Sequence, residues 1–231
     1  MNLLIINGWS ASAALWSEFI QLLPKDWSVR VLDLDHAGDV EFWCQRIEAQ
    51  LSTPSLILGW SLGGALATEY LARTAHPNCL GLVTVATNPC FVVRDDWPCA
   101  MPEAIFAEFS ALVESGDLSA LVRRFRFLLT QDRSELSRLK DLYNEESLPS
   151  IAVLQSGLAL LKTLDVRARL SQLKIPHLSA FGTEDALVPI AVSERTTPNS
   201  AVRIEGMGHL PCISFASALK EQLLAFAVNL A

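Results

Sequence analysis

Six short apolar runs alternate along the chain with longer segments whose apolar residues recur every three or four positions. Such runs are typical of strands buried on both faces of a sheet, and the longer segments are typical of helices packed against one face. Strands are expected at 3–7, 28–32, 55–60, 80–86, 177–181 and 201–204, and helices at 14–23, 40–51, 62–74 and 215–228. The alternation predicts an α/β fold in which a mostly parallel sheet of about six or seven strands has helices on both faces.

One interval interrupts this alternation. Between about residues 90 and 170 the sequence has no convincing strand, and helical patterns occur at 101–114, 118–129, 134–145 and 151–161. Helices inserted between two strands of one sheet predict a helical cap over the carboxyl edge, where open α/β sheets bind ligands. Because neither a repeat nor a Gly/Ser-rich linker divides the chain, we expect one domain over residues 1–231, with the cap inserted at about 90–170.

Charge and cysteine content limit the partners and the compartment. The 231 residues include 18 Lys and Arg against 25 Asp and Glu, a net charge of −7, which disfavours nucleic acid and anionic membranes as partners. The first residues do not form a signal peptide, and no apolar stretch approaches the roughly 18 residues of a membrane span. The five cysteines have no C-x-x-C spacing, so we expect reduced thiols, no metal or other cofactor, and a cytoplasmic monomer.

One strand-turn-helix motif indicates the chemistry. The sequence Gly-Trp-Ser-Leu-Gly-Gly at 59–64 follows the apolar run 55–58 and precedes a helical pattern, the context of a nucleophile elbow around Ser61. A sharp turn strains the backbone of the serine and brings neighbouring chain close, which explains the glycines two residues before and after it. The alternative is an ordinary glycine-rich turn. A phosphate loop would need Lys followed by Ser or Thr, and a dinucleotide site would need G-x-G-x-x-G.

A serine nucleophile needs a histidine base. Among the four histidines, His209 follows the expected strand at 201–204 in a turn with two glycines, and it is the favoured base. His36 also follows a strand and is the competitor. His76 follows a helix and His177 lies within a strand, so neither is expected at a catalytic edge.

The acid that orients the base is expected in the loop after the preceding strand. Asp185 lies in this loop, so the order along the chain is nucleophile, acid, base, as in α/β-hydrolases. Glu184 is the nearest rival acid, and Asp95 or Asp96 is a second. The oxyanion hole is expected to use the backbone N–H of Leu62 and of Trp9.

Five segments give the sequence a family resemblance. Residues 7–9, 59–64, 83–91, 94–98 and 161–165 together resemble the pimeloyl-acyl-carrier-protein methyl ester carboxylesterases of biotin synthesis, a group of α/β-hydrolases. The resemblance implies a serine carboxylesterase that removes the methyl group from a pimeloyl chain on acyl carrier protein, without a cofactor. The sequence departs from the family at Asn7, where His is usual, and in the loop 33–38.

Other functions stay open at this point. A general short-chain acyl esterase or thioesterase would use the same triad without a carrier protein. A lyase would use the serine as a base, and a binding module would have the scaffold without the reaction, although such modules normally lose a triad member.

The resemblance also implies substrate contacts in the cap. Residues 127–131 resemble the segment that lines the acyl channel of the family, so Phe127 and Gln131 are expected to bind substrate together with Trp9 and Leu62. Further aromatic residues are candidates for the channel or for the core beneath the cap: Phe91, Trp97, Phe106, Phe109 and Phe125.

Positive charge is concentrated in the cap. Residues 121–140 contain six basic and two acidic residues, a local sum of +4, so the rest of the chain carries −11. The acyl carrier protein is acidic, so a basic stripe near the channel is expected to bind it. The residues expected to make these contacts are Arg124, Arg126 and Arg138; the alternative is a solvated helix face.

Overall fold

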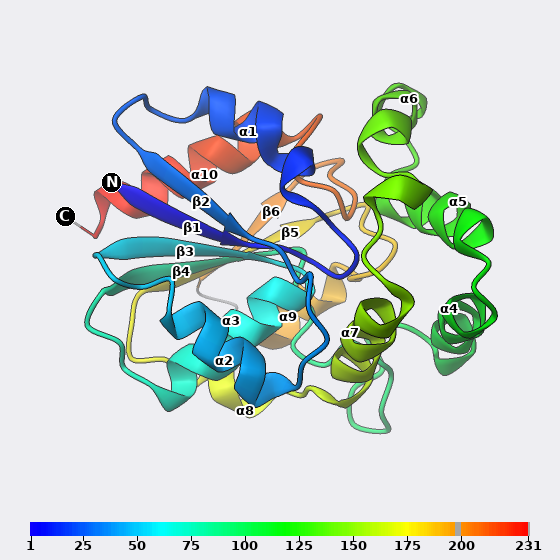
Figure 1. Ribbon diagram of the computed structural model, residues 1–231. Helices are drawn as coiled ribbons and strands as arrows, with labels where there is room; N and C mark the ends of the chain where they lie inside the picture. Colours follow the sequence, from blue (N-terminus) through cyan, green and yellow to red (C-terminus); the bar gives the residue numbers. More distant parts are fainter. Residues whose placement is uncertain (197–199, 231) are drawn as a thin grey trace.

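The computed structural model describes residues 1–196 and 200–230. Within them, six strands form one parallel sheet in the order β2-β1-β3-β4-β5-β6 (Figure 1). The strands are β1 (Asn2–Ile6), β2 (Ser28–Leu32), β3 (Ser55–Trp60), β4 (Cys79–Val85), β5 (His177–Gly182) and β6 (Ala201–Ile204). The predicted α/β class, the parallel sheet and the position of every strand are therefore confirmed.

Helices cover both faces of the sheet (Figure 1). On one face lie α1 (Ser17–Leu22), preceded by a 3-10 turn at Ala13–Trp16, and α10 (Ala216–Val228). On the other lie α2 (Val40–Glu48), α3 (Leu62–Arg73), α8 (Arg167–Leu170) and α9 (Ala191–Thr196). Helices α8 and α9 were not predicted from the sequence, since four and six residues are too few to establish a helical period.

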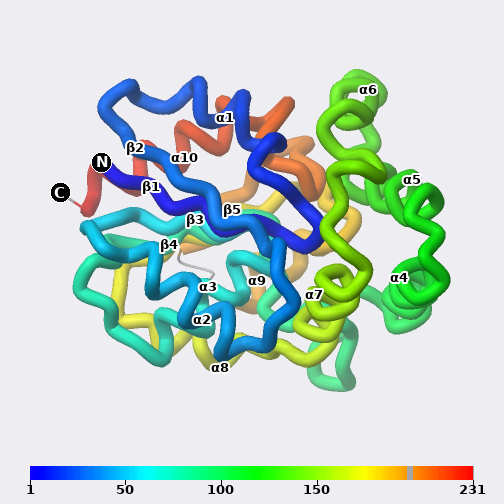
Figure 2. The backbone as a smooth tube through the Cα atoms, viewed as in Figure 1, coloured from blue at the N-terminus to red at the C-terminus, as the bar shows by residue number. Residues whose placement is uncertain are grey.

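Four further helices lie between β4 and β5 in the sequence and cover the carboxyl edge of the sheet (Figure 2). We call them the cap: α4 (Glu103–Ser115), α5 (Leu118–Leu129), α6 (Arg133–Leu142) and α7 (Ile151–Thr163). A short 3-10 turn, Glu145–Ser147, separates α6 from α7. Strand and cap residues belong to one cluster of buried apolar side chains, so the cap is packed onto the sheet and not suspended above it.

The two ends of the cap are joined at its base. Cys90 and Asp165 form an antiparallel bridge, and the Val166 N–H donates to the Pro89 carbonyl at 2.8 Å. Arg167 binds both oxygens of Asp165, which lowers the pKa of that carboxyl. The segment that leaves β4 and the segment that returns toward β5 therefore hold each other in place.

Backbone segments approach one another closely where β3 turns into α3. A β-carbon on Gly63 would lie 2.3 Å from the Ile6 carbonyl oxygen, and one on Gly59 would lie 2.5 Å from the α-carbon of Gly64. Real β-carbons do not come so near to backbone atoms. These positions therefore need glycine for space, as the sequence indicated.

Among the described helices, none combines the length and the apolar character needed to cross a membrane.

Changing Gly63 to Ala tests the close approach of Gly63 to the carbonyl oxygens of Ile6 and Asn7. Because both oxygens belong to the backbone, we expect the free energy of unfolding to fall by about 3 kcal/mol or more. This corresponds to a fall in Tm of about 6–12 °C for a chain of this size. Gly81→Ala is the matched control. Its β-carbon would lie 3.1 Å from the ends of the Leu230 and Phe226 side chains and 3.2 Å from the Pro176 carbonyl oxygen, and shifts of a few tenths of an ångström relieve such contacts. An equal loss of stability in both variants, measured by thermal unfolding, would contradict the prediction.

Candidate active site

Ser61 occupies a strained turn between β3 and α3. Its φ is 54° and its ψ is −120°, a conformation that L-residues adopt only when the surrounding structure holds them there. The Ser61 N–H donates to the Val85 carbonyl at 3.0 Å, and its carbonyl accepts from the Gly64 N–H at 3.0 Å. These bonds on both sides fix the direction of the side chain.

The segment after β6 brings His209 over the edge of the sheet to Ser61. The Nε2 atom of His209 lies 3.0 Å from the Ser61 Oγ, and the imidazole is buried. The indole N–H of Trp60 donates to the His209 carbonyl at 2.9 Å, so the residue before the serine also fixes the backbone of the histidine.

Asp185, in the loop after β5, binds the other side of the imidazole. Its Oδ2 and Oδ1 atoms lie 2.9 and 3.1 Å from the His209 Nδ1. Oδ1 also accepts the backbone N–H groups of Leu187 and Val188, both at 2.8 Å. Since an ionised carboxylate only accepts hydrogen bonds, Nδ1 donates the proton and Nε2 is left to accept from the Ser61 hydroxyl.

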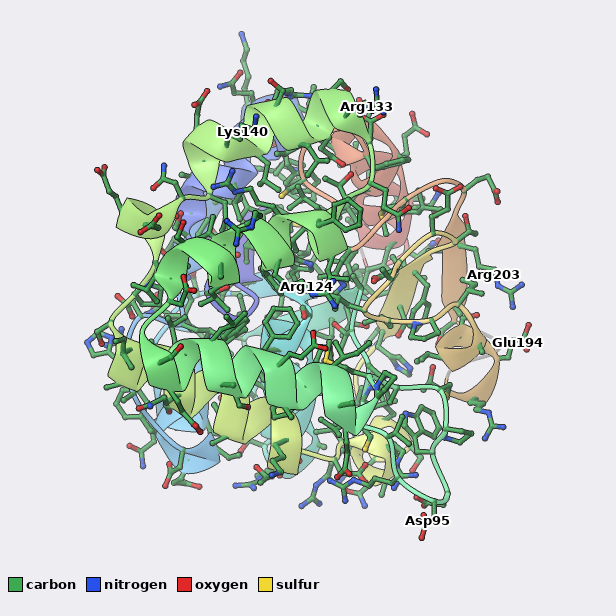
Figure 3. All side chains as sticks on the ribbon, turned by 90° about the vertical axis from the view of Figure 1, so that its right-hand side faces the viewer. Asp95, Arg124, Arg133, Lys140, Glu194 and Arg203 are labelled. Atoms are coloured by element: carbon green, nitrogen blue, oxygen red, sulfur yellow. The ribbon has the colours of Figure 1, made fainter. Side chains whose placement is uncertain are left out.

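The rival residues do not reach this arrangement. His36 is exposed and hydrogen-bonded to its neighbour Asp35 at 2.6 Å. Glu184 is exposed, and Asp95 points outward at the tip of a loop (Figure 3). Asp96 pairs with Arg167 at 2.9 Å. The structure thus brings together Ser61, Asp185 and His209 and separates the competing acids and base from them.

The loop after β1 is held by buried polar contacts. Asn7, where the resembling family has His, donates from Nδ2 to Asp33 at 2.7 Å and accepts the Trp16 indole N–H at 2.8 Å. Ser10, with φ at 59°, shares a 2.6 Å hydrogen bond with the buried Tyr143 hydroxyl of the cap. Side chains of the body and of the cap therefore both fix this loop.

Trp9 joins the same loop to cap helix α7. Its indole N–H donates to the Leu154 carbonyl at 2.9 Å, and a β-carbon on Gly157 would lie 2.4 Å from the indole. Within the described part of the chain, the hydrogen bonds include none from the backbone N–H of Trp9 or of Leu62. Both groups can therefore donate to a ligand at Ser61.

An apolar cavity opens onto Ser61 beneath the cap. Ser61 and His209 are its polar lining residues, and the other lining residues, Trp9 among them, have aromatic or aliphatic side chains. Besides Trp9 they are Phe91, Met101, Phe106, Phe109, Phe125, Leu158, Leu161 and Leu187. The apolar lining is of the kind that contacts a hydrocarbon chain whose reactive end reaches Ser61.

Two aromatic candidates lie outside this cavity. Trp97 packs beneath the Arg167 guanidinium, 5.3 Å from its ring centroid. Phe127 is 57% exposed and lines an outer groove between α4 and α5 with Leu112 and Arg123. The physical reason lies in the helical period: Phe125 faces the cavity, and a residue two positions later faces the opposite way.

Gln131 is also placed away from the cavity. It lies beyond the end of α5, exposed, and lines a polar hollow with Asp132 and Glu184. The aliphatic wall of the cavity was not predicted from the sequence; it consists of Leu158 and Leu161 of α7 and of Leu187. The spacing of three along α7 was the available signal for its first two members.

The cap arginines differ in their surroundings. Arg124 on α5 pairs with Glu108 of α4 at 3.2 Å, and Arg138 on α6 pairs with Glu18 of α1. Arg126 is half-buried, and its Nε atom lacks an acceptor among the described residues. Figure 3, which faces the cap, shows Arg124 on α5 and Arg133 and Lys140 on α6. The basic residues thus occupy two helices, and Arg126 is not a free surface charge.

Neither metal ligands nor reactive thiols are evident. Within residues 1–196 and 200–230 no group of three or more His, Cys, Asp or Glu side chains could hold a metal ion. Burial raises the pKa of the Cys44 and Cys79 thiols to about 11, so these thiols are poor nucleophiles near neutral pH.

Comparison with known proteins gives a consistent pattern. Residues 3–221 match the model of the alpha/beta hydrolase family. A pimeloyl-acyl-carrier-protein methyl ester esterase of Aeromonas hydrophila subsp. hydrophila is 32% identical, covering 92% of this chain and 90% of the relative. The esterase of that name from Pectobacterium carotovorum subsp. carotovorum is also 32% identical, covering 98% of this chain and 94% of the relative.

Solved structures show the same fold. A bromoperoxidase from Bacillus anthracis superposes with a TM-score of 0.84 at 22% identity, and an esterase from Exiguobacterium antarcticum with 0.80 at 20%. Each comparison covers 98% of this chain and 91% of the other chain.

Asn7→Ala tests the contacts that hold the loop after β1. The substitution leaves the buried Trp16 indole N–H without its acceptor and removes one of two donors to the half-buried Asp33 carboxylate, which keeps the Ala13 N–H. We therefore expect a loss of about 1–3 kcal/mol in the free energy of unfolding. Asn2→Ala is the matched control, because Asn2 also donates from its amide, to the Pro54 carbonyl at 2.9 Å, but at the exposed end of the same strand. Denaturant unfolding measures the free energy of unfolding of both variants. Equal losses would contradict a special role for the buried contacts of Asn7.

Proposed function

Because the chain belongs to the alpha/beta hydrolase family, we propose that it hydrolyses the methyl ester of a pimeloyl chain carried on acyl carrier protein. The observation that carries the proposal is the hydrogen-bonded series Asp185–His209–Ser61 at the end of an apolar cavity. The names of the relatives support the choice of ester and carrier. The cavity supports it independently, since its lining suits a hydrocarbon chain with an uncharged end.

Acylation follows from the geometry at Ser61. His209 Nε2 takes the hydroxyl proton while the Ser61 oxygen bonds to the ester carbonyl carbon. The backbone N–H groups of Trp9 and Leu62 stabilise the negative oxygen that forms. His209 then returns the proton to the methoxy oxygen, the bond between this oxygen and the acyl carbon breaks, and methanol leaves.

Deacylation repeats these steps with water. His209 removes a proton from the water, whose oxygen attacks the acyl carbon, and the Ser61 oxygen takes the proton back as the free acid is released. Asp185 keeps Nδ1 protonated and stabilises the imidazolium in both halves of the reaction. The residues present supply every proton transfer.

The acyl chain and the carrier use different parts of the cap. The chain lies in the cavity, against side chains such as Phe106 and Phe125, and the carrier binds outside. Arg124 and Arg138 are exposed enough to contact an acidic protein. The local charge of +4 favours binding of such a partner at the cap, whereas the net charge of −11 on the rest of the chain repels it. We assign these contacts to Arg124 and Arg138 and not to Arg126, which is half-buried.

Growth of a biotin auxotroph that lacks its methyl esterase tests the function. We expect the wild-type gene to restore growth without biotin and Ser61→Ala to fail, because the variant has no nucleophile. Asp185→Asn is expected to lower kcat about 10⁴-fold in a purified assay, since the amide holds the wrong imidazole tautomer.

Glu184→Gln is the matched control, because this neighbouring acid does not contact the imidazole, and it is expected to behave as wild type. Soluble wild-type protein that does not restore growth would contradict the biotin assignment. Equal losses in Glu184→Gln and Asp185→Asn would contradict the assignment of the acid.

Reversing charge on the cap tests the carrier interaction and separates it from general esterase activity. The double variant Arg124→Glu, Arg138→Glu is expected to raise KM for carrier-bound pimeloyl methyl ester about tenfold. KM for p-nitrophenyl butyrate is expected to stay the same, because that ester does not need the carrier.

Arg203→Glu is the control, since Arg203 is also a surface arginine in an ion pair. Its partner is Glu194, at 3.1 Å, and the pair lies away from the cap (Figure 3). Equal changes in KM for both esters would argue against carrier docking on the cap. Faster turnover of p-nitrophenyl butyrate than of the carrier-bound ester by the wild type would favour the general esterase.

A further inference from the structure

A buried acid in the cap contacts the segment that follows His209. Glu135, the third residue of α6, is only 1% exposed. Its Oε1 atom accepts the backbone N–H of Ser214 at 2.9 Å. Ser214 lies five residues after His209 and two residues before α10, in the segment beside α6 in Figure 1. One side chain of the cap therefore reaches the loop that holds the base.

The surroundings of Glu135 suit a negative charge. A buried carboxylate is costly unless hydrogen bonds and favourable fields compensate for lost water. Glu135 lies in the first turn of α6 and faces the residue that leads into α10, so the partial positive charge of two helix N-termini stabilises it. Its bond to Ser214 is charge-assisted, a class about twice as strong as neutral hydrogen bonds.

Leu210, Cys212 and Ile213 of this loop are buried in the apolar core, but few other hydrogen bonds fix its backbone. The His209 carbonyl accepts from the Trp60 indole, and the Leu210 N–H donates to the Leu129 carbonyl at 3.1 Å. Between the end of β6 at Ile204 and the start of α10 at Ala216 the chain belongs to no strand or helix. The bond to Glu135 fixes the far end of the loop that follows His209, as the bond to Leu129 fixes its beginning.

We infer that Glu135 is a positioning residue for His209, which it holds at hydrogen-bond distance from Ser61 by binding the Ser214 N–H. The inference rests on the proposed function for its kinetic consequence. Displacing a reacting group by about 1 Å costs on the order of 10²-fold in rate. The backbone contact at Leu129 cannot be removed by substitution, whereas the contact of Glu135 can.

An ion pair of α6 provides a control that separates the positioning of His209 from the general stability of the cap. Arg138, one turn after Glu135, binds Glu18 of α1, so Glu18 also ties α6 to the body of the protein. The ion pair includes no residue of the segment 209–215, and Glu18 acts on this segment only through its charge near Cys212. Removing the Glu18 carboxylate therefore loosens the cap without releasing the loop of His209.

Kinetics on p-nitrophenyl butyrate, which does not require the carrier, test the inference together with hydrogen exchange of the segment 209–215. Glu135→Ala is expected to lower kcat about 10- to 100-fold with KM within twofold and to speed amide exchange in this segment. Glu135→Gln, which keeps an acceptor oxygen, is expected to retain kcat within about threefold. Glu18→Ala is expected to leave kcat and exchange in 209–215 as in wild type.

If Glu135→Ala does not fold, Glu135→Asp replaces it. The aspartate withdraws the carboxylate by about 1.5 Å. We expect its loss of kcat to lie between the threefold limit for Glu135→Gln and the smallest loss expected for Glu135→Ala, about tenfold. Unchanged kcat and unchanged exchange in the alanine variant, or the aspartate variant in its place, would overturn the inference. So would an equal loss of kcat in Glu18→Ala. The exchange data decide it even if wild-type protein lacks esterase activity, an outcome that would reject the proposed function alone.

Discussion

At the carboxyl ends of β1, β3 and β5 the chain passes so close to neighbouring backbone that only hydrogen fits between the segments. Gly63 lies against the carbonyls of Ile6 and Asn7, and a β-carbon on Gly182 would lie 2.0 Å from the Met207 carbonyl oxygen. The loop after β1, the turn at Ser61 and the segment before His209 each start from one of these contacts. The distances in the site are therefore set by packed backbone, which has little freedom to adjust.

The cap completes this geometry from the other side. The loop after β1 is bonded to it through the Trp9 indole and through Ser10, and the segment after His209 is bonded to it at Leu210. A movement of the cap would shift the groups around Ser61 as well as the walls of the cavity. The insertion thus contributes to the arrangement of the reacting groups besides covering them.

The strands and the turn around Ser61 could be predicted from the sequence because their signals are local: apolar runs, helical periods and glycines at fixed offsets. The placement of Asp185 and His209 followed from their positions after strands. Short helices such as α8 left no periodic signal. The environment of Arg126 could not be predicted, because it depends on how α5 packs against its neighbours, which no local pattern specifies.

Phe127 is an instructive exception, because the signal was present. Leu121, Phe125 and Leu129 recur at intervals of four and define the buried face of α5, and Phe127 does not belong to that series. The resemblance to a channel-lining segment favoured the cavity, whereas the helical period favoured the surface. The structure follows the period.

The cavity has a consequence for the direction of the reaction. The substrate of the proposed reaction is a neutral methyl ester, which enters an environment of hydrocarbon side chains without losing strong hydration. The acid formed by hydrolysis ionises near neutral pH, and among the described lining residues the cavity offers no lysine or arginine to balance its charge. Burying such an ion unpaired is costly, so the change of charge weakens the binding of the product and favours its departure into water.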